Sequence, residues 1–492
     1  MTKTNRRKFL AWSIAGSVAT VFSTRCAGST LLRNLPFSIP SRNTSPSVYR
    51  SLAGLLEVSL QASQERLALG SQTANLLTYN GQVPGPRLEA KSGDTVRILL
   101  KNQLEQPTNL HFHGLHIPPT GNADNVFLMV PHGETQSYEF TIPKQHPGGL
   151  FWYHPHPHGL VAEQVFGGLA GPLIIRGEVD AIPEIQAAQE AILVLQDFDL
   201  NRWGQRREPT PLLRRLGREG NLMRVNGGSA PELTIPQAGL LRLRLLNASP
   251  SRIYRLQLEN HPWHLIGLDG GTLPEPIELE TDLTLAPGER ADILVAGTRE
   301  PNTYKLLSLP YDRGIADMMG GMEHHHTDNT RPESTAIVLA RFNYGESTTA
   351  VPLPEMLLPY TPLADPTKQR EFVLDHGIHK GQSFLINGRG FEHDRVDTTV
   401  QLGTVEDWRI INKAGMDHPF HIHTNAFQVL NRNGQPFPFS VWKDVVNIPA
   451  YEAVDLRIAF TDFPGKSVYH CHILDHEDQG MMGILEIQTA SV

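Results

Sequence analysis

Near its C-terminus the chain reads YHCHILDHEDQGMM over residues 469–482. If residues 468–472 form a strand, successive side chains point to opposite faces of the sheet. His470 and His472 then share one face, and Cys471 occupies the other. Because two imidazoles and a thiolate cannot bind a single metal in that arrangement, the strand is expected to bridge two different metal centres.

Two further candidate ligands, His476 and Met481, follow Cys471 at intervals of five residues. A Cys, two His and a weak Met form the ligand set of a blue copper site. The second imidazole must come from elsewhere in the chain. The segment HPFHIH offers His418, which lies one turn-like step before the next His pair and is free to reach a different metal.

Four pairs of histidines in the sequence have the spacing His-x-His, which places both imidazoles of a pair on one face of a strand. One such pair is a weak signal, but four pairs together with the Cys-His-Met set indicate a cluster of several metals, since imidazole suits copper. The cluster is expected at a junction between the first and third domains. The pairs are His111/His113, His154/His156, His421/His423 and His470/His472.

The remaining histidines are expected to play smaller parts. His116 and His158 are predicted to lie beside the ligands or at the surface, and His376, His379 and His393 to be surface residues. The segment HPWH at 261–264 is interpreted as a turn with a packed tryptophan, because no Cys and no His-x-His pair accompanies it in its domain.

The composition favours an all-β protein. The 492 residues include 42 Gly and 37 Pro, and short apolar runs separated by turn residues dominate. The net charge of −8 does not indicate the excess of basic residues that is typical of nucleic-acid-binding proteins. With only Cys26 and Cys471 in the chain, no disulfide framework is expected.

The N-terminus resembles an export signal. Arg6–Arg7, followed by Phe9–Leu10 and a modest apolar stretch, is typical of twin-arginine signals over residues 1–28. The apolar run is shorter than the roughly 20 residues of a spanning helix. We therefore expect export through the twin-arginine machinery, a periplasmic or otherwise exported location, and no stable membrane span after processing.

The rest of the chain divides into three β-regions joined by linkers. Residues rich in Ser, Pro and Asn predict the first linker, and the Pro-rich stretch VPLPEMLLPYTPLADP predicts the second. The predicted order is linker 29–54, domain 55–178, domain 179–345 without copper of its own, linker 346–370 and domain 371–492.

A Gly-rich segment at 315–329, IADMMGGMEHHHTDN, concentrates thioethers and imidazoles. These groups bind Cu(I), so the segment is interpreted as a loop that delivers Cu(I). The alternative is a surface loop without a role. The candidate ligands in it are Met318, Met319, Met322, His324, His325 and His326.

With these motifs the chain resembles the bacterial three-domain multicopper oxidases, of the laccase and periplasmic cuprous oxidase type. The four copper motifs appear as HFHG, YHPH, HPFHIH and HCHILDHEDQGM, and further landmarks as PGPRLEAKSGDTV and GERADILV. The resemblance spans about residues 70 to 490. It implies an all-β chain of three cupredoxin-like Greek-key β-sandwiches holding four copper ions.

The resemblance also implies a role for each ligand. The type 1 site would take His418, Cys471 and His476, with Met481 axial. The type 2 copper would take His111 and His421. The two type 3 coppers would take His113, His154 and His472, and His156, His423 and His470. Because no ligand is missing, the copper-free relatives that serve as cell-division or assembly proteins are disfavoured.

Reducing O2 to water consumes protons, so acids are needed near the cluster. Asp124 and Glu477 occupy positions that resemble the proton-relay acids of the family; the alternatives are a turn-former and an exposed loop carboxylate. Asp417, next to His418, is expected to orient the donor. An axial Met predicts a modest type 1 potential, which a redox titration would check.

Three functions remain open at this stage. The first is oxidation of Cu(I) or another metal ion, in keeping with copper homeostasis and the Met/His segment. The second is laccase-like oxidation of phenols and aromatic amines, with that segment as a partial lid. The third, from another class, is a copper store or carrier without O2 turnover, which would not need imidazoles paired across domains.

Overall fold

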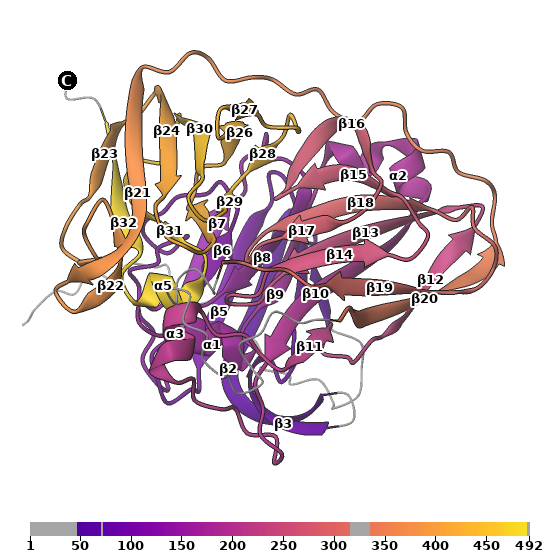
Figure 1. The fold of residues 1–492 in the computed structure, drawn as a ribbon, viewed down its shortest axis with the longest axis horizontal. Coiled ribbons are helices and arrows are strands. Elements are labelled where there is room, and N and C mark those ends of the chain that lie inside the picture. The colour runs from indigo at the N-terminus through magenta and orange to yellow at the C-terminus, as the bar shows by residue number, and fades with distance from the viewer. Residues whose placement is uncertain (1–46, 70–71, 315–334, 490–492) are drawn as a thin grey trace, which may run out of the picture. The chain divides into compact units, whose positions relative to one another are not determined.

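The computed structural model describes residues 47–69, 72–314 and 335–489. The predicted export signal and the Met/His segment lie outside these residues, as does Cys26. Strands make up most of the described chain and the helices are short (Figure 1), so the all-β prediction is confirmed. Among the described residues, no helix is long and apolar enough to cross a membrane.

The first β-region contains two sheets. One has the strand order β1-β4-β9-β8-β6 and the other β3-β2-β5-β7. Its elements are β1 Val48–Arg50, β2 Leu55–Leu69, β3 Gln72–Tyr79, β4 Arg87–Lys91, β5 Thr95–Asn102, β6 His111–His113, β7 Thr135–Thr141, β8 Gly149–His154, α1 Val161–Gly167 and β9 Gly171–Arg176. Strand β1 pairs in parallel with β4, although its residues belong to the stretch 29–54 predicted as linker.

The second β-region follows a short connection and again contains two sheets. Their orders are β11-β10-β13-β18-β15-β16 and β12-β20-β19-β14-β17. The connection holds η2 Glu178–Ala181 and α2 Pro183–Ala187. The region's elements are β10 Gln189–Phe198, α3 Pro211–Leu216, β11 Leu222–Val225, β12 Glu232–Gln237, β13 Leu240–Asn247, β14 Tyr254–Leu258, β15 Trp263–Leu268, β16 Gly271–Leu279, β17 Leu283–Leu285, β18 Arg290–Ala296, β19 Thr303–Leu309 and β20 Ile337–Ser347.

The third β-region carries most of the candidate ligands. One sheet has the order β22-β21-β24-β30-β26-β27, with β28 paired to β26, and the other β23-β32-β31-β25-β29. Its elements are β21 Lys368–His379, β22 Gln382–Ile386, β23 Thr398–Gln401, β24 Thr404–Asn412, β25 His418–Ile422, β26 Phe427–Arg432, β27 Gln435–Pro436, β28 Trp442–Lys443, β29 Val445–Ile448, β30 Ala453–Phe460, β31 Gly465–Cys471, α5 Leu474–Asp478 and β32 Met482–Gln488.

The strands form where apolar and polar residues alternate. In β5 (TVRILLKN), Val96, Ile98 and Leu100 are fully buried, whereas Arg97 and Leu99 between them are only partly buried. Burying each such side chain contributes about 1.5–3 kcal/mol. Each pair of sheets encloses its own apolar cluster, one per β-region, so the described chain contains three two-sheet sandwiches.

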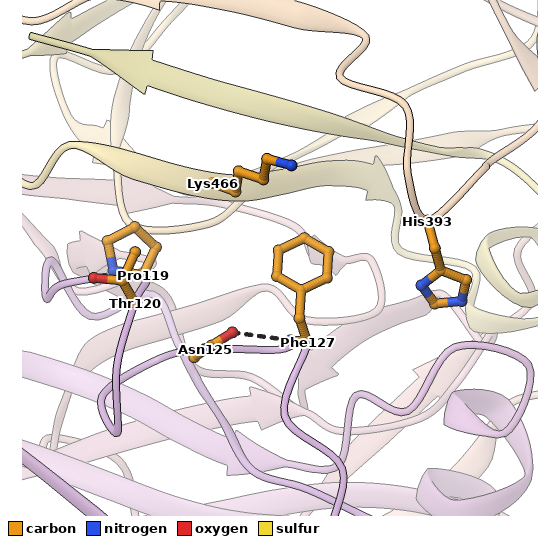
Figure 2. A pocket seen from close by; sticks show the side chains of 6 residues that line it. All are labelled: Pro119, Thr120, Asn125, Phe127, His393 and Lys466. Atoms are coloured by element: carbon orange, nitrogen blue, oxygen red, sulfur yellow. Dashed lines mark hydrogen bonds between the residues drawn. The ribbon is translucent and has the colours of Figure 1, made fainter.

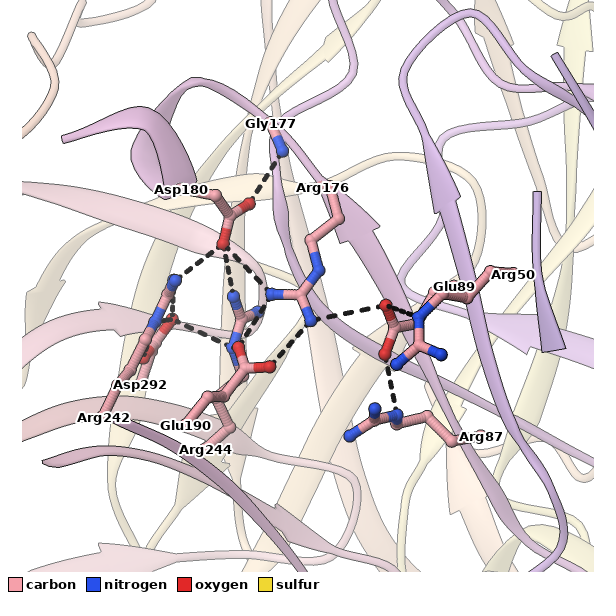
Figure 3. A network of polar contacts seen from close by, with 10 residues as sticks. All are labelled: Arg50, Arg87, Glu89, Arg176, Gly177, Asp180, Glu190, Arg242, Arg244 and Asp292. Atoms are coloured by element: carbon pink, nitrogen blue, oxygen red, sulfur yellow. Dashed lines mark hydrogen bonds and ion pairs between the residues drawn. The ribbon is translucent and has the colours of Figure 1, made fainter. Parts of the chain in front are cut away.

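A network of charged side chains joins the first and second sandwiches (Figure 3). Arg176 at the end of β9 donates two hydrogen bonds to Glu190 on β10, at 2.8 and 2.7 Å. Arg242 and Arg244 on β13 both donate to Asp180, at 2.6 and 2.7 Å. Because these side chains are mostly buried, the network fixes how the two sheets meet.

Candidate metal centres

Strands β25 and β31 lie side by side and bring the predicted type 1 ligands together. The Nδ1 atom of His418 lies 3.3 Å from Sγ of Cys471 and 3.2 Å from Nδ1 of His476. Sγ of Cys471 lies 3.9 Å from Nδ1 of His476. One thiol and two ring nitrogens therefore converge on one point, which is the donor set of a blue copper site.

The surroundings of this point are apolar. Met481 and the three ligands are fully buried, and Phe384 stacks on the ring of His476 with centroids 3.9 Å apart. Burial lowers the pKa of both imidazoles well below the ordinary value and raises that of the Cys471 thiol. Neutral imidazoles are ready to bind a metal, and a bound cation would deprotonate the thiol.

All eight imidazoles of the His-x-His pairs are buried and lie together between the first and third sandwiches. Nε2 of His470 lies 3.3 Å from Nε2 of His156 and 3.1 Å from Nε2 of His423. Three neutral imidazoles cannot satisfy one another through the same ring atom, whereas one metal ion can accept all three. This trio is the second type 3 set that the family resemblance implies.

The other five imidazoles also converge, but their groups overlap. His111 shares one group of potential ligands with His113 and His154 and another with His421 and His423. The ring of His472 lies 5.0 Å from that of His113, centroid to centroid. The donor atoms are thus present, and their division into one type 2 and one type 3 set stays a prediction.

Unpaired ring nitrogens support a metal cluster at this place. Burial is the largest cause that lowers the pKa of every one of these imidazoles, and neighbouring imidazoles add to it for His111, His421 and His472. A buried nitrogen without a partner costs about 1–3 kcal/mol, which a metal would recover. Within these eight imidazoles, the buried ring nitrogens without a hydrogen-bond partner among the described residues are His111 Nε2, His113 Nδ1, His154 Nε2, His421 Nε2, and both nitrogens of His472.

The two predicted relay acids lie directly against the cluster. Asp124 accepts from Nδ1 of His111 at 2.9 Å and from the Phe112 amide at 2.8 Å, and burial raises its pKa to about 8. Glu477 is fully buried, with Oε2 3.2 Å from Nδ1 of His470, and burial raises its pKa well above the ordinary value. Neither is therefore a solvent-exposed turn or loop residue; their role as relays stays a prediction.

Asp444 is a buried acid that the sequence motifs did not indicate. Its Oδ1 accepts from Nε2 of His113 at 2.9 Å, and its backbone oxygen accepts from Nδ1 of His421 at 2.7 Å. Arg290, from the second sandwich, donates to both carboxylate oxygens at 2.6 Å. One residue thus orients two candidate ligands, and the neighbouring Lys443 pairs with Asp269 at 2.7 Å. The sequence landmark GERADILV contains Arg290, the partner of Asp444, and is the one motif that could have pointed to this acid.

Asp417 is buried in a hydrogen-bonded triad beside His418. Its Oδ2 accepts from the Tyr311 hydroxyl at 2.7 Å and from the Asn447 amide at 2.8 Å. Burial is the first cause that raises the pKa of Tyr311, followed by the Asp417 charge. The Asp417 side chain is thus held by Tyr311 and Asn447, and its predicted contact with a donor stays a prediction.

Among the remaining histidines, the prediction for His376 needs correction. His376 is not a plain surface residue, because its ring lies 5.4 Å from that of His418 and its Nε2 is buried without a partner in the described chain. The pairing of β21 with β22 shifts its register between His376 and His379. Trp263 is 1% exposed, so it is packed as predicted, but Trp263 and His264 begin strand β15 and do not lie in a turn. His116 and His158 are partly buried.

An open surface hollow is lined by residues of the first and third β-regions (Figure 2). Its walls include Asn125 and Phe127, which follow Asp124 in the chain, and Lys466 from β31. His393 also lines it, so this histidine is at the surface as predicted. None of the predicted ligands lines the hollow.

The comparisons with known proteins agree with this geometry. Two family models described as multicopper oxidase match residues 61–180 and 363–491. A multicopper oxidase of Staphylococcus aureus is 30% identical over 422 residues, covering 84% of each chain. The cell division protein FtsP of Photorhabdus laumondii is also 30% identical, over 85% of this chain and 86% of that one.

A solved structure is similar over most of the chain. The multicopper oxidase from Campylobacter jejuni, described as a metallo-oxidase, is 31% identical with a TM-score of 0.78, and the match covers 90% of this chain and 94% of that one. Three sandwiches, the converging buried imidazoles and the matches over most of the length lead to one conclusion: the chain is a member of the multicopper oxidase family.

Proposed function

We propose that the protein couples one-electron oxidation of a donor to the four-electron reduction of O2 to two waters, using four copper ions. The observation that carries the proposal is the complete set of buried imidazole and thiol donors, arranged as two centres to which strand β31 contributes side chains from opposite faces. Copper in these centres would supply the one-electron redox steps and the coordination positions for O2.

The chain's own residues do the rest. Cys471 faces the type 1 pocket, while His470 and His472 on either side face the cluster, so the two centres share one short peptide path. Glu477 and Asp124 hold protons at carboxylates beside His470 and His111. Four protons are consumed for each O2, and these acids are placed to pass them inward.

We infer that the donor is Cu(I) or another metal ion. Support comes from the Met/His segment at 315–326 and from the metallo-oxidase of Campylobacter jejuni. Oxidation of phenols and aromatic amines is the second candidate, favoured by the similarity to a laccase-like enzyme of Ochrobactrum sp., 27% identical with a TM-score of 0.76. Export through the twin-arginine machinery, supported by Arg6–Arg7, would place the enzyme in the periplasm or outside the cell.

The test combines copper content with O2 consumption. The copper-loaded protein is assayed with Cu(I) and with a methoxyphenol, as the intact chain and without residues 315–326. We expect about four copper ions per chain, and Cu(I) oxidation that falls selectively on deletion. Unchanged Cu(I) oxidation with faster phenol oxidation would make the segment a lid and favour the laccase-like function.

Copper binding without any O2 turnover would instead identify a store or carrier. Absence of copper would place the chain with proteins of the FtsP kind, whose members are its relatives at a similar identity. The complete donor set argues for the oxidase, because a protein without copper would bury these unpaired nitrogens at a cost.

A further inference from the structure

The outward edge of one type 1 ligand is covered by a segment of the second sandwich. Since Nδ1 of His476 faces His418 and Cys471, the opposite ring atom, Nε2, points away from the metal position. That atom donates a hydrogen bond to the backbone oxygen of Arg215 at 3.1 Å. His476 is fully buried, with this segment at its outer edge and Phe384 stacked on its ring.

Several contacts hold the covering segment in place. Arg218 forms three side-chain hydrogen bonds to the Asp475 carboxylate, at 3.0, 3.0 and 2.7 Å, and its backbone amide adds a fourth at 2.8 Å. Gln479 donates to the Arg214 oxygen at 2.9 Å. The Arg218 and Asp475 side chains are only 8% and 2% exposed, so solvent screens this pair little.

The fit between the two segments is close. Gly217 has a φ of +74°, and a Cβ there would lie 2.6 Å from Cγ2 of Ile473, which caps α5. Arg313 donates to the Gly217 oxygen at 2.8 Å. The cover, defined as Pro211–Arg218, is therefore a packed part of the fold rather than a loose loop.

The outer side of the cover faces solvent. Arg214 and Arg215 are exposed, and Leu212 is 43% exposed. An aromatic donor that approaches from this side meets helix α3 and cannot stack on the imidazole of His476. A metal ion needs no such stacking and requires only ligand atoms at the surface.

We propose that the cover 211–218 is a specificity determinant that withholds His476 from aromatic donors, and that Arg218 is the positioning residue that fixes it. This inference rests on the proposed oxidase function and deepens it. A donor outside the cover gives up one electron without forming a bond to the protein. Cu(I) becomes Cu(II), and a phenol becomes a phenoxyl radical whose proton goes to solvent.

The first test measures access to the type 1 pocket in the metal-free protein. Cys471 lies beneath the cover and is fully buried, and Cys26→Ser makes it the only thiol of the chain. We expect Arg218→Gln and Asp475→Asn each to speed its reaction with an aromatic disulfide reagent at least about fivefold, because releasing the clamp favours local opening. Amide hydrogen exchange over residues 211–218 is expected to accelerate in parallel.

The matched control is Arg370→Gln, which breaks a similar two-point ion pair with Glu406 in the third sandwich. That pair does not touch α5 or the cover, so thiol reactivity should stay at the parental rate. Arg218→Lys keeps the charge but loses the two-point geometry, and it should give an intermediate rate.

The second test uses the copper-loaded variants. Releasing the cover should lower the KM for a dimethoxyphenol severalfold, leave that for Cu(I) within about twofold, and shift the type 1 visible absorption band. The proposal is overturned if exchange over 211–218 accelerates while thiol reactivity and the phenol KM stay parental, or if exchange itself does not change. If the thiol reacts faster in the variants but the protein consumes no O2 with any donor, the cover is supported and the proposed oxidase function is refuted.

Discussion

Glu477 is a buried carboxyl group whose two oxygens have no hydrogen-bond partner among the described residues. Such a group is costly to bury, and it lies within 3.2 Å of one candidate ligand, His470, and 3.4 Å of another, His156. The cost is accounted for if the acid serves the cluster as a proton donor. Asp124 beside His111 is buried as well, but its carboxylate accepts hydrogen bonds from His111 and from the Phe112 amide.

We expect Glu477→Gln to slow O2 reduction at least about tenfold, because positioned acids contribute on the order of a hundredfold or more to proton-coupled steps. Reduction of the type 1 site by the donor should continue at the parental rate. Stopped-flow measurement of the blue band, with turnover measured by an oxygen electrode, separates the two steps. Glu486→Gln, on the outer part of β32, is the control. Full turnover in both Glu477→Gln and Asp124→Asn would refute the relay.

The pair Asp444–Arg290 supports a second prediction at this scale. Asp444→Ala leaves Arg290, 1% exposed, without its two-point partner, and removing one side of a buried pair costs about 3–5 kcal/mol. The free energy of unfolding of the metal-free protein, from urea titration, should fall by about 3 kcal/mol. The double variant with Arg290→Met should lose less than the sum of the two single variants; additive losses would show that the pair is not coupled.

At the scale of elements, the turn before β18 reaches the cluster. Gly288 has a φ of +84°, and a Cβ there would lie 2.9 Å from Nε2 of His472. The turn therefore lies so close to His472 that only a residue without a side chain fits at position 288. It belongs to the second sandwich, so a domain without its own ligands shapes the cluster.

We expect Gly288→Ala to reduce the copper content of the cluster, because the added methyl group displaces His472. Gly403→Ala is a matched control, since its φ is +83° and no atom lies within 4 Å of the added Cβ. Both variants bear a backbone cost of about 1–2 kcal/mol. Copper per chain, measured after reconstitution, should fall only in Gly288→Ala; equal copper contents would contradict the contact with His472.

The sequence was informative about elements where residue alternation has a direct geometric meaning. The pattern His470–Cys471–His472 predicted a strand with two faces, and β31 confirms it. It was uninformative about α3, whose sequence PLLRRL carries no chemical motif and acts through the backbone oxygen of Arg215. Backbone contacts of this kind depend on tertiary structure and leave no signature in residue type.

For the whole molecule, alternation and turn residues were enough to predict an all-β chain, and the ligand motifs were enough to locate the cluster. By themselves they could not predict which ring meets which, because the partners lie hundreds of positions apart, and the grouping of the rings followed only from the family resemblance. His113 and Asp444 are separated by 331 residues. A buried acid such as Asp444 becomes recognisable only once the sandwiches are assembled.

The charge network between the first two sandwiches predicts a pH dependence of stability. Burial alone would raise the pKa of Glu190, but hydrogen bonds from Arg176 and the charges of Arg244 and Arg242 outweigh it and hold this pKa at about 2 (Figure 3). The folded-state pKa is thus below the unfolded value of about 4.3. The resulting stabilisation is present above that value and is lost as the pH falls towards 2.

We expect Glu190→Gln to lower the free energy of unfolding by roughly 2 kcal/mol at pH 7, with allowance for partial solvent exposure. The difference from the parent should shrink between about pH 5 and pH 2 and vanish below. Urea titrations across this range measure it. Glu134→Gln, an exposed residue outside the network, is the control. A difference that is constant with pH would show that the carboxylate charge is not responsible.

The close approach of His156 and His470, which lie 314 positions apart in the sequence, has a consequence for how the protein is made. The N-terminal partner leaves the ribosome long before its C-terminal partner is synthesised. A nascent or truncated chain therefore offers copper only fragments of each centre, and the complete centres appear when translation is finished. A protein that carries its full number of copper ions has therefore been synthesised to its C-terminus and has folded.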